Sequence, residues 1–314
     1  MHILQAEQWQ AYENTHAARA DALTAAHRER RARGQQHPIE DFLFSYYRLS
    51  PNQLRKWHPG AGFALEDADA ERATWRYYTT VHRSSVSGRN RASHVTIVNL
   101  EEFFAERETT VDYIETLLRN TLEARPQFGC FGLHEWAMVY QLNPQQRRHP
   151  QLHLRLGAEE TDRVVENSHI ACSHFDAYRF FTSAAQPLNR LRPSRETQTR
   201  DEQPACLHAG MDIYKWVGKL EPIVPGDLLL DAFELARDIR VVDMCASPYD
   251  VSGYGYTAIP IETPEGKREY ARLQRGFAER SNVLRQRVLS TISHARELRE
   301  AHLYRLMTPS GHHQ

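Results

Sequence analysis

Apolar residues recur at helical spacing over several long stretches of the chain. This spacing predicts a helix over residues 100–124, which Pro126 ends. A helix is also predicted over 5–33, which is rich in Ala, Glu, Gln and Arg, and 264–305 predicts one long charged helix or a bent pair. The apolar residues that share one side of the 100–124 helix are Phe103, Phe104, Val111, Ile114, Leu117 and Leu118.

The rest of the chain combines short strand-like runs with two further helices. Residues 74–81 and 94–98 are β-branched and aromatic, and the Ser, Gly, Arg and Asn between them predict a hairpin. Helices are predicted over 204–220 and 226–243. The run 257–261 is typical of an edge strand, because its proline cannot donate a hydrogen bond to a β-ladder.

These elements predict a helix-dominated α+β protein with a small antiparallel β element. A chain of 314 residues with 41% hydrophobic and 25% charged residues can bury a sizeable core without disulfides. We expect a single compact domain. It would consist of an N-terminal helical and hairpin portion (1–127), a centre that carries the site (128–256) and a C-terminal helical portion (257–314).

Charge and cysteine content limit the partners and the cellular compartment that we expect. A net charge of -1 and a pI of about 7.0 give no global attraction to nucleic acid. No apolar run approaches the length of a membrane span, and the N-terminus does not have the pattern of a leader sequence. Four cysteines are too few for a disulfide scaffold, so we expect reduced thiols in a cytoplasmic protein that does not contact a membrane.

Two short blocks bring thiol, imidazole and carboxylate side chains together. One runs from Cys172 through His174 to Asp176, and the other is Cys206-Leu207-His208. Two Cys-x-His pairs could supply a tetrahedral Cys2His2 set for zinc. Against this set, Cys206 and His208 begin a predicted helix, where side chains two positions apart diverge, and the spacing is tighter than in common zinc sites.

The same blocks allow a second metal interpretation and an interpretation without metal. His174 and Asp176, with His208 as the third ligand, could form a facial triad for non-haem iron. On the predicted helix, His208 and Asp212 lie one turn apart, and Lys215 follows three residues later. That row of side chains suits either a catalytic relay or a surface ion network.

A third block, residues 129–136, places His134 and Glu135 beside Trp136. A carboxyl group next to an indole can have a raised pKa, as catalytic acids require. Met138 occupies the position where a His-Glu-x-x-His zinc helix has its second histidine. A hydrogen-bonded core histidine beside a surface glutamate is the alternative interpretation.

Four strings of the sequence, residues 128–140, 172–181, 206–216 and 238–250, resemble a mainly actinobacterial family commonly labelled 3-methyladenine DNA glycosylase. The resemblance covers most of the chain, and the strings are long enough to be specific. The chain departs from the family pattern at Cys245, where arginine is usual. The resemblance implies removal of alkylated purines from DNA by cleavage of the N-glycosidic bond, with no cofactor required.

Base removal needs a carboxylate, aromatic rings that stack on an extruded base, and basic residues that contact phosphates. The residues for these roles are our own hypotheses. The catalytic candidates are Glu135, Asp176, Asp212, His134, His174 and His208, and the substrate-binding candidates are Trp136, Tyr178, Arg179, Lys215 and Trp216.

The concentration of histidine and cysteine favours a different class of enzyme. A metal-dependent enzyme with zinc or non-haem iron, or a Cys/His-dependent enzyme, would explain it and would act on a small molecule rather than on alkylated DNA. The neutral pI and the lack of a helix-hairpin-helix pattern also favour an enzyme that acts on a small molecule. A regulatory or scaffold protein with a structural site is a third interpretation.

Overall fold

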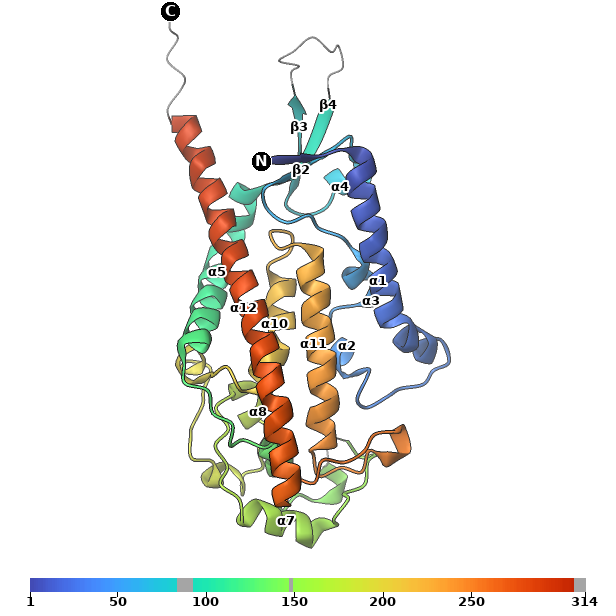
Figure 1. Cartoon of the computed structure of the whole chain (residues 1–314), viewed down its shortest axis with the longest axis vertical. Coiled ribbons are helices and arrows are strands. Elements are labelled where there is room, and N and C mark those ends of the chain that lie inside the picture. The colour runs from blue at the N-terminus through green and yellow to red at the C-terminus, as the bar shows by residue number, and fades with distance from the viewer. Residues whose placement is uncertain (84–92, 147–148, 308–314) are drawn as a thin grey trace, which may run out of the picture.

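Helices dominate the structure (Figure 1). The computed structural model describes residues 1–83, 93–146 and 149–307. A small sheet lies at one end of the molecule beside the N-terminus, and a long C-terminal helix runs along most of its length (Figure 1). The predicted helix-dominated α+β class is confirmed. Within these described ranges, no helix is long and apolar enough to cross a membrane.

The predicted long helices are all present. The runs 5–33, 100–124, 204–220 and 226–243 form α1, α5, α10 and α11, and 264–305 lies in one continuous helix, α12. The α-helices are α1 (Ala6–Ala32), α2 (Phe42–Tyr46), α3 (Pro51–Arg55), α4 (Ala70–Ala73), α5 (Leu100–Glu123), α6 (Leu133–Ala137), α7 (Ala158–Glu166), α8 (Phe175–Tyr178), α9 (Gln198–Asp201), α10 (Leu207–Lys219), α11 (Gly226–Cys245) and α12 (Pro264–Met307). Short 3-10 helices cover Pro144–Gln146, Gln186–Leu188 and Ser252–Tyr254.

The sheet is mixed rather than purely antiparallel. Its strands lie in the order β1-β2-β4-β3, and β1 is parallel to β2 whereas the other pairs are antiparallel. The predicted hairpin is confirmed as β3 and β4, although β3 begins four residues later than expected because 74–77 form a turn after α4. The strands are β1 (His2–Leu4), β2 (Phe63–Glu66), β3 (Tyr78–Arg83) and β4 (Ser93–Val98).

The edge strand predicted over 257–261 is wrong. These residues run as irregular chain into α12, far along the sequence from the strands of the sheet. The backbone N–H of Ile259 donates to the carbonyl oxygen of Cys245 at 2.8 Å, and Ile261 is fully buried. The apolar side chains of this run therefore cover the core after α11 instead of pairing with a strand.

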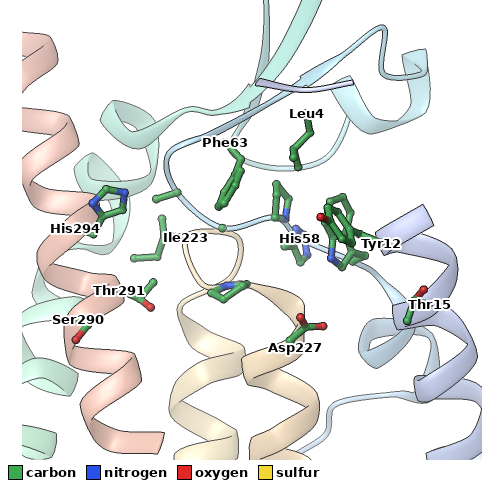
Figure 2. Close-up of a pocket in the computed structure, with 15 residues that line it drawn as sticks. Leu4, Tyr12, Thr15, His58, Phe63, Ile223, Asp227, Ser290, Thr291 and His294 are labelled. Atoms are coloured by element: carbon green, nitrogen blue, oxygen red, sulfur yellow. The ribbon is translucent and has the colours of Figure 1, made fainter. Parts of the chain in front are cut away.

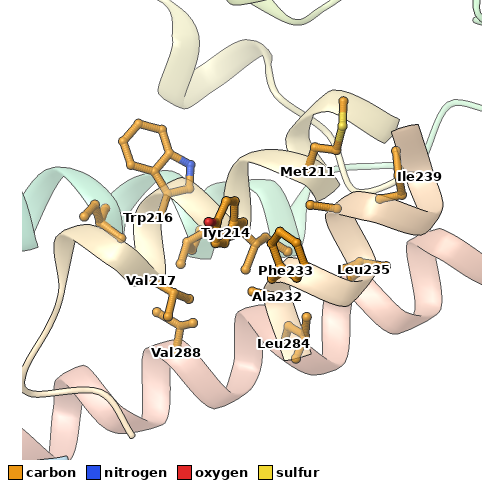
Figure 3. Packing of buried hydrophobic residues seen from close by; sticks show 14 of the residues in the cluster. Met211, Tyr214, Trp216, Val217, Ala232, Phe233, Leu235, Ile239, Leu284 and Val288 are labelled. Atoms are coloured by element: carbon orange, nitrogen blue, oxygen red, sulfur yellow. The ribbon is translucent and has the colours of Figure 1, made fainter. Parts of the chain in front are cut away.

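The core is built on α10 and α11, with α12 packed across both (Figure 3). A Cβ atom at Gly210 would lie 2.7 Å from Ser281 Oγ and 2.9 Å from Ile239 Cδ1, so this glycine lets the three helices approach closely. Because α10 and α11 run antiparallel, the start of α10 meets the end of α11, and their linking loop lies about 20 Å away. The packed side chains include Met211, Tyr214, Val217, Phe233, Leu235, Leu284 and Val288.

Candidate metal centre

Two clusters of histidine and carboxylate side chains lie where the start of α10 meets the end of α11. In each cluster, one nitrogen or oxygen atom from each of three residues lies within 4.8 Å of the other two. The His208 cluster consists of His134, His208 and Asp243, and the His174 cluster consists of His174, Glu202 and Asp212.

The His208 cluster joins three elements that are distant in the sequence. His208 lies in the first turn of α10 and Asp243 in the last turn of α11. His134 lies in α6, which follows Gly132 at a φ of 71°, a left-handed conformation that favours glycine. A Cβ atom at Gly132 would also lie 3.4 Å from Ala246 Cβ. The glycine therefore lets α6 pack against the end of α11.

A buried ion-pair network holds the His208 cluster. His134 Nε2 lies 2.9 Å from Asp243 Oδ1, and His134 Nδ1 lies 3.8 Å from the sulfur of Cys130. Arg240 Nη1 donates to Asp243 Oδ2 at 3.0 Å and to Glu135 Oε1 at 3.2 Å. Because these charged groups are buried, each needs its partner to offset the loss of hydration.

The ring of His208 lies between the other two histidines. Its centroid is 4.4 Å from that of His134, edge-on, and 5.3 Å from that of His174, nearly parallel. The His208 ring is half-buried. It borders two cavities of about 10 and 20 Å³. Cavities of this size hold about one water molecule each.

Asn189 fixes the segment that carries His174. Its side-chain oxygen accepts a hydrogen bond from the backbone N–H of Cys172 at 2.8 Å. Its side-chain nitrogen donates to the carbonyl oxygens of Cys172 and Leu191, both at 2.9 Å. These bonds from one buried amide hold the backbone two residues before His174, which is why the imidazole enters the core at a defined place.

The imidazole of His174 is buried without a hydrogen bond. Its exposed fraction is 1%, and neither ring nitrogen has a hydrogen-bond partner in the described structure. Nε2 lies 3.4 Å from Glu202 Oε1 and 3.5 Å from Asp212 Oδ2, beyond the usual range of about 2.7–3.2 Å for such bonds. Three ligand-type atoms therefore converge without bonding to one another.

Both carboxylates of the His174 cluster are oriented by other side chains. Asp212 Oδ1 accepts from the Tyr47 hydroxyl at 2.8 Å, and Oδ2 accepts from Lys215 Nζ at 3.0 Å. Glu202 Oε1 accepts from Gln198 Nε2 at 2.6 Å. Such supporting hydrogen bonds are typical of residues that surround metal ligands, because they fix the direction of each ligand oxygen.

Asp176 belongs to neither cluster. Its Oδ2 accepts from Lys215 Nζ at 3.2 Å, while its Oδ1 lies 3.1 Å from Arg179 Nε and accepts from Arg195 Nη2 at 3.3 Å. Three cations therefore neutralise this carboxylate. Arg179 and Lys215, which we expected to bind substrate, are instead engaged in this ion-pair network.

Neighbouring charges set the protonation of the histidines. Burial lowers the pKa of His134, but Asp243 outweighs burial and raises this pKa well above its ordinary value. Burial and the charge of His134 together lower the pKa of His208. Burial also opposes protonation of His174, but the carboxylates raise its pKa overall. A cationic and a neutral imidazole thus lie side by side in the His208 cluster, which suits proton transfer.

The predicted metal sets are not assembled in the described residues. Of the proposed zinc ligands, His174 and His208 lie in different clusters, and burial raises the pKa of both Cys172 and Cys206. Raised pKa values keep thiols protonated, which disfavours their use as metal ligands or nucleophiles. The proposed iron triad is not brought together either, since Asp176 lies in neither cluster and pairs with three cations.

The aromatic residues proposed to stack on a base are mostly core residues. Trp136 is fully buried, and its Nε1 donates to the carbonyl oxygen of Ala246 at 2.9 Å. Trp216 has an exposed fraction of 4% and lies under the ammonium of Lys215, 4.2 Å from its ring centroid. Tyr178 is half-buried against the core. The two tryptophans therefore offer no open face to a base.

Sequence patterns did not single out Glu202, Asp243 or Arg240 as site residues. A signal did exist for the pair on α11, because Arg240 and Asp243 lie three residues apart in its last turns, residues 239–245, which are otherwise apolar. Charges on a buried helix face usually pair with each other or serve a site. Glu202 has no such local signal, since it lies between polar residues just after α9.

A larger hollow, which we call the cleft, lies at the opposite end of α10 and α11 (Figure 2). Its volume is about 510 Å³, and it lies above the loop that joins α10 to α11, between α1 and α12. Apolar and aromatic side chains, among them Tyr12, Trp57, Phe63 and Ile223, form much of its wall. None of the six cluster residues borders it.

No protein-family model, curated protein or solved structure matches the chain. The resemblance of its sequence strings to the family labelled as glycosylases stays a prediction. The function is therefore argued from the geometry of the two clusters and of the cleft.

Proposed function

We propose that the protein is a metal-dependent enzyme that acts on a small molecule, with a zinc or iron ion held by the His174 cluster. The observation that carries this proposal is the buried imidazole of His174, whose Nε2 lies 3.4 and 3.5 Å from two carboxylate oxygens. An ion about 2.0–2.2 Å from each ligand, in tetrahedral geometry, separates the ligand atoms by about 3.3–3.6 Å. The observed spacing matches that separation.

The donor set also suits these metals. One imidazole and two carboxylates, from Glu202 and Asp212, form a mixed nitrogen and oxygen set that zinc and iron both accept. Three protein ligands leave a coordination position for a reactant, as in catalytic rather than structural sites. A cation would also offset the negative charge of two carboxylates that are each less than 3% exposed.

A buried ion pair without metal is the competing explanation. In that case, a protonated His174 would donate a hydrogen bond to Glu202 or Asp212, because an unpaired buried donor costs about 1–3 kcal/mol. Its Nε2 lies too far from both oxygens for a normal bond, and Nδ1 also has no partner among the described residues. The geometry therefore favours a shared cation over an imidazolium ion.

The cavities beside the neighbouring His208 cluster limit the size of the reacting group. When bound, the metal ion would act as a Lewis acid that polarises the reacting group. The two cavities at His208 admit only water-sized groups, so the reacting end of the substrate must be small.

The surroundings of the larger of these two cavities suggest the substrate class. Phe42, Tyr46, Met138 and Phe180 border it together with His208. Aromatic and apolar walls around a few polar groups are typical of sites for small organic molecules. A small, largely apolar metabolite is therefore the proposed substrate, and a cytoplasmic location is part of the proposal.

Metal content and turnover test this proposal together. We expect His174→Gln to lose one equivalent of bound zinc or iron, measured by elemental analysis of protein purified without chelator. We also expect the variant to lose turnover of small molecules, measured by mass spectrometry of a metabolite extract incubated with the protein. His294→Gln, at an exposed histidine of the cleft, is the matched control and should behave as the unaltered chain. Metal-free protein with full turnover would overturn the proposal.

Base excision from alkylated DNA is the second candidate function. The cleft favours it, since a hollow of about 510 Å³ with aromatic walls can hold a purine, whereas the cavities at the clusters cannot. Release of free 3-methyladenine from alkylated DNA in the presence of EDTA would support this function and exclude a metal requirement. No base release by pure protein would exclude base excision.

A further inference from the structure

We infer that the His208 cluster holds a second divalent metal ion, so that the two clusters together form a dinuclear centre. This inference rests on the proposed function, because it adds a neighbour to the ion in the His174 cluster. The first observation is the set of donors itself. Two imidazoles and a carboxylate, from His134, His208 and Asp243, bring three ligand atoms within 4.8 Å of one another.

The separations of these atoms fit a metal ion. His134 Nε2 and Asp243 Oδ1 lie 2.9 Å apart. Adjacent ligands of a six-coordinate ion, each about 2.0–2.2 Å from the metal, lie about 2.8–3.1 Å apart. The pair can therefore occupy neighbouring coordination positions with little movement of either side chain.

A second, independent observation is the position of the His208 ring. It is half-buried, borders both water-sized cavities and lies between the rings of His134 and His174. An imidazole that borders open space beside two other histidines can bind a metal ion in that space.

The outer contacts of the cluster match those of metal ligands. His134 Nδ1 faces the sulfur of Cys130 at 3.8 Å, so the ring nitrogen that points away from the cluster has a hydrogen-bond acceptor. Arg240 binds Asp243 Oδ2 at 3.0 Å and leaves Oδ1 directed at His134. Ligating histidines and carboxylates in proteins are usually held in this way by a second set of residues.

The two clusters are close enough to form one centre. His208 and Asp212 lie one turn apart on α10, and the rings of His208 and His174 are 5.3 Å apart. In known two-metal sites the ions are about 3.5–4 Å apart. Together the clusters supply three imidazoles and three carboxylates, and helical cores commonly build two-metal carboxylate sites from such residues.

Metal titration tests the second ion. Protein stripped with EDTA is titrated with Co(II) under reducing conditions and followed by visible absorption and elemental analysis. We expect two equivalents per chain in the unaltered protein, one in His208→Gln and two in the control His294→Gln. One equivalent in the unaltered protein, unchanged by His208→Gln, would overturn this inference and leave the proposed function intact. No bound metal would overturn both.

A spectroscopic measurement on the unaltered chain avoids reliance on the folding of a variant. With two equivalents of Mn(II) bound, we expect an EPR spectrum of exchange-coupled ions, because neighbouring paramagnetic ions in one centre interact. A spectrum of isolated Mn(II) alone, at the same loading, would contradict a dinuclear centre.

Discussion

Each end of the α10 and α11 pair holds a buried histidine beside a carboxyl group, which is fully buried in Asp243 and half-buried in Glu221, and the two pairs differ in charge. The end that holds the candidate metal centre is called the metal-centre end. There, His134 Nε2 lies 2.9 Å from Asp243 Oδ1, and the pKa of His134 is raised while that of Asp243 is lowered. At the cleft end, His58 Nε2 lies 3.7 Å from Glu221 Oε1. There, burial lowers the pKa of His58 to about 3 and raises the pKa of Glu221 to about 8.

The partners of each pair explain this difference. Arg240 binds Asp243 directly and stabilises its charge, and ionised Asp243 in turn stabilises protonated His134. Glu221 Oε1 has no hydrogen-bond partner among the described residues, so burial dominates and both members stay neutral at pH 7. Similar residue types thus give a charged pair where the chain supplies a cation and a neutral pair where it does not.

The two ends also differ in cavity volume. The cleft is the larger hollow, and volume alone would select it as the ligand site. His208 instead borders both cavities of about 10 and 20 Å³, and the unpaired imidazole of His174 lies beside it, with the ring centroids 5.3 Å apart. These unpaired and perturbed polar groups, rather than cavity volume, are the reason why we propose the site at this end.

Removal of Arg240 should have the largest effect on stability. In Arg240→Ala, the carboxylates of Asp243 and Glu135 lose a buried partner, and losing one member of a buried ion pair costs about 3–5 kcal/mol. The free energy of unfolding, measured by urea titration in EDTA, should fall by about that amount. A double variant, Arg240→Met with Asp243→Asn, removes one charge of each sign and should cost less. Equal losses in both variants would contradict the charged pair.

The sequence predicted the long helices but not the small strands. In α5, the apolar spacing repeats over many turns, and every apolar residue expected on its inner side is buried. Strands of three and four residues, such as β1 and β2, contain too few positions for alternation to be visible. Their pairing also depends on contacts between His2–Leu4 and Phe63–Glu66, which no local pattern reports.

For the site, the sequence predicted residues but not their grouping. His134, His174, His208 and Asp212 were predicted from their chemical types and nearby spacing. Their division into two clusters depends on how α6, α10 and α11 pack, which spacing within one segment does not reveal. Asp176 was favoured for its position beside His174, but three cations that come from later residues bind it.

Overpacking of α10 should disturb the metal-centre end more than an ordinary helix substitution does. In Gly210→Ala, the new Cβ atom would meet Ser281 Oγ and Ile239 Cδ1 at less than 3.0 Å. Such overpacking typically costs about 1–3 kcal/mol. The control, Gly276→Ala on an open face of α12, should raise stability by up to about 1 kcal/mol. Thermal unfolding of both variants checks this difference, and a neutral Gly210→Ala would show that α12 is not held against α10.

The neutral pair at the cleft end should make stability depend on pH. Glu221 holds its proton up to about pH 8 in the folded chain, whereas its ordinary pKa is 4.5, so the unfolded chain binds fewer protons between these values. The free energy of unfolding therefore falls as pH rises, by about 1.4 kcal/mol per pH unit. His58 contributes little above about pH 7.5, because its ordinary pKa is 6.5 and its pKa in the folded chain is about 3.

Glu221→Gln isolates this dependence, because glutamine resembles the protonated carboxyl group. We expect the stability of the variant relative to the unaltered chain to rise by about 1.4 kcal/mol per pH unit between pH 6.5 and 7.5. Urea titration at several pH values measures this difference and cancels the other titrating groups. A constant difference across this range would mean that Glu221 is ionised when folded and that the two ends do not differ in charge.

The smallest expected effect comes from Asp227→Asn, which we compare with Asp243→Asn at the other end of α11. Asp227 lies in the first turn, at the cleft, and its side chain is 69% exposed, whereas Asp243 lies in the last turn and is fully buried. Asp227→Asn should cost about 0.3–1 kcal/mol, the usual value of an acidic group at a helix N-terminus, and should leave metal content unchanged. Asp243→Asn should lose one equivalent of metal. Loss of metal in Asp227→Asn would show that the cleft and the metal centre are coupled along α11, because no cluster residue contacts the cleft.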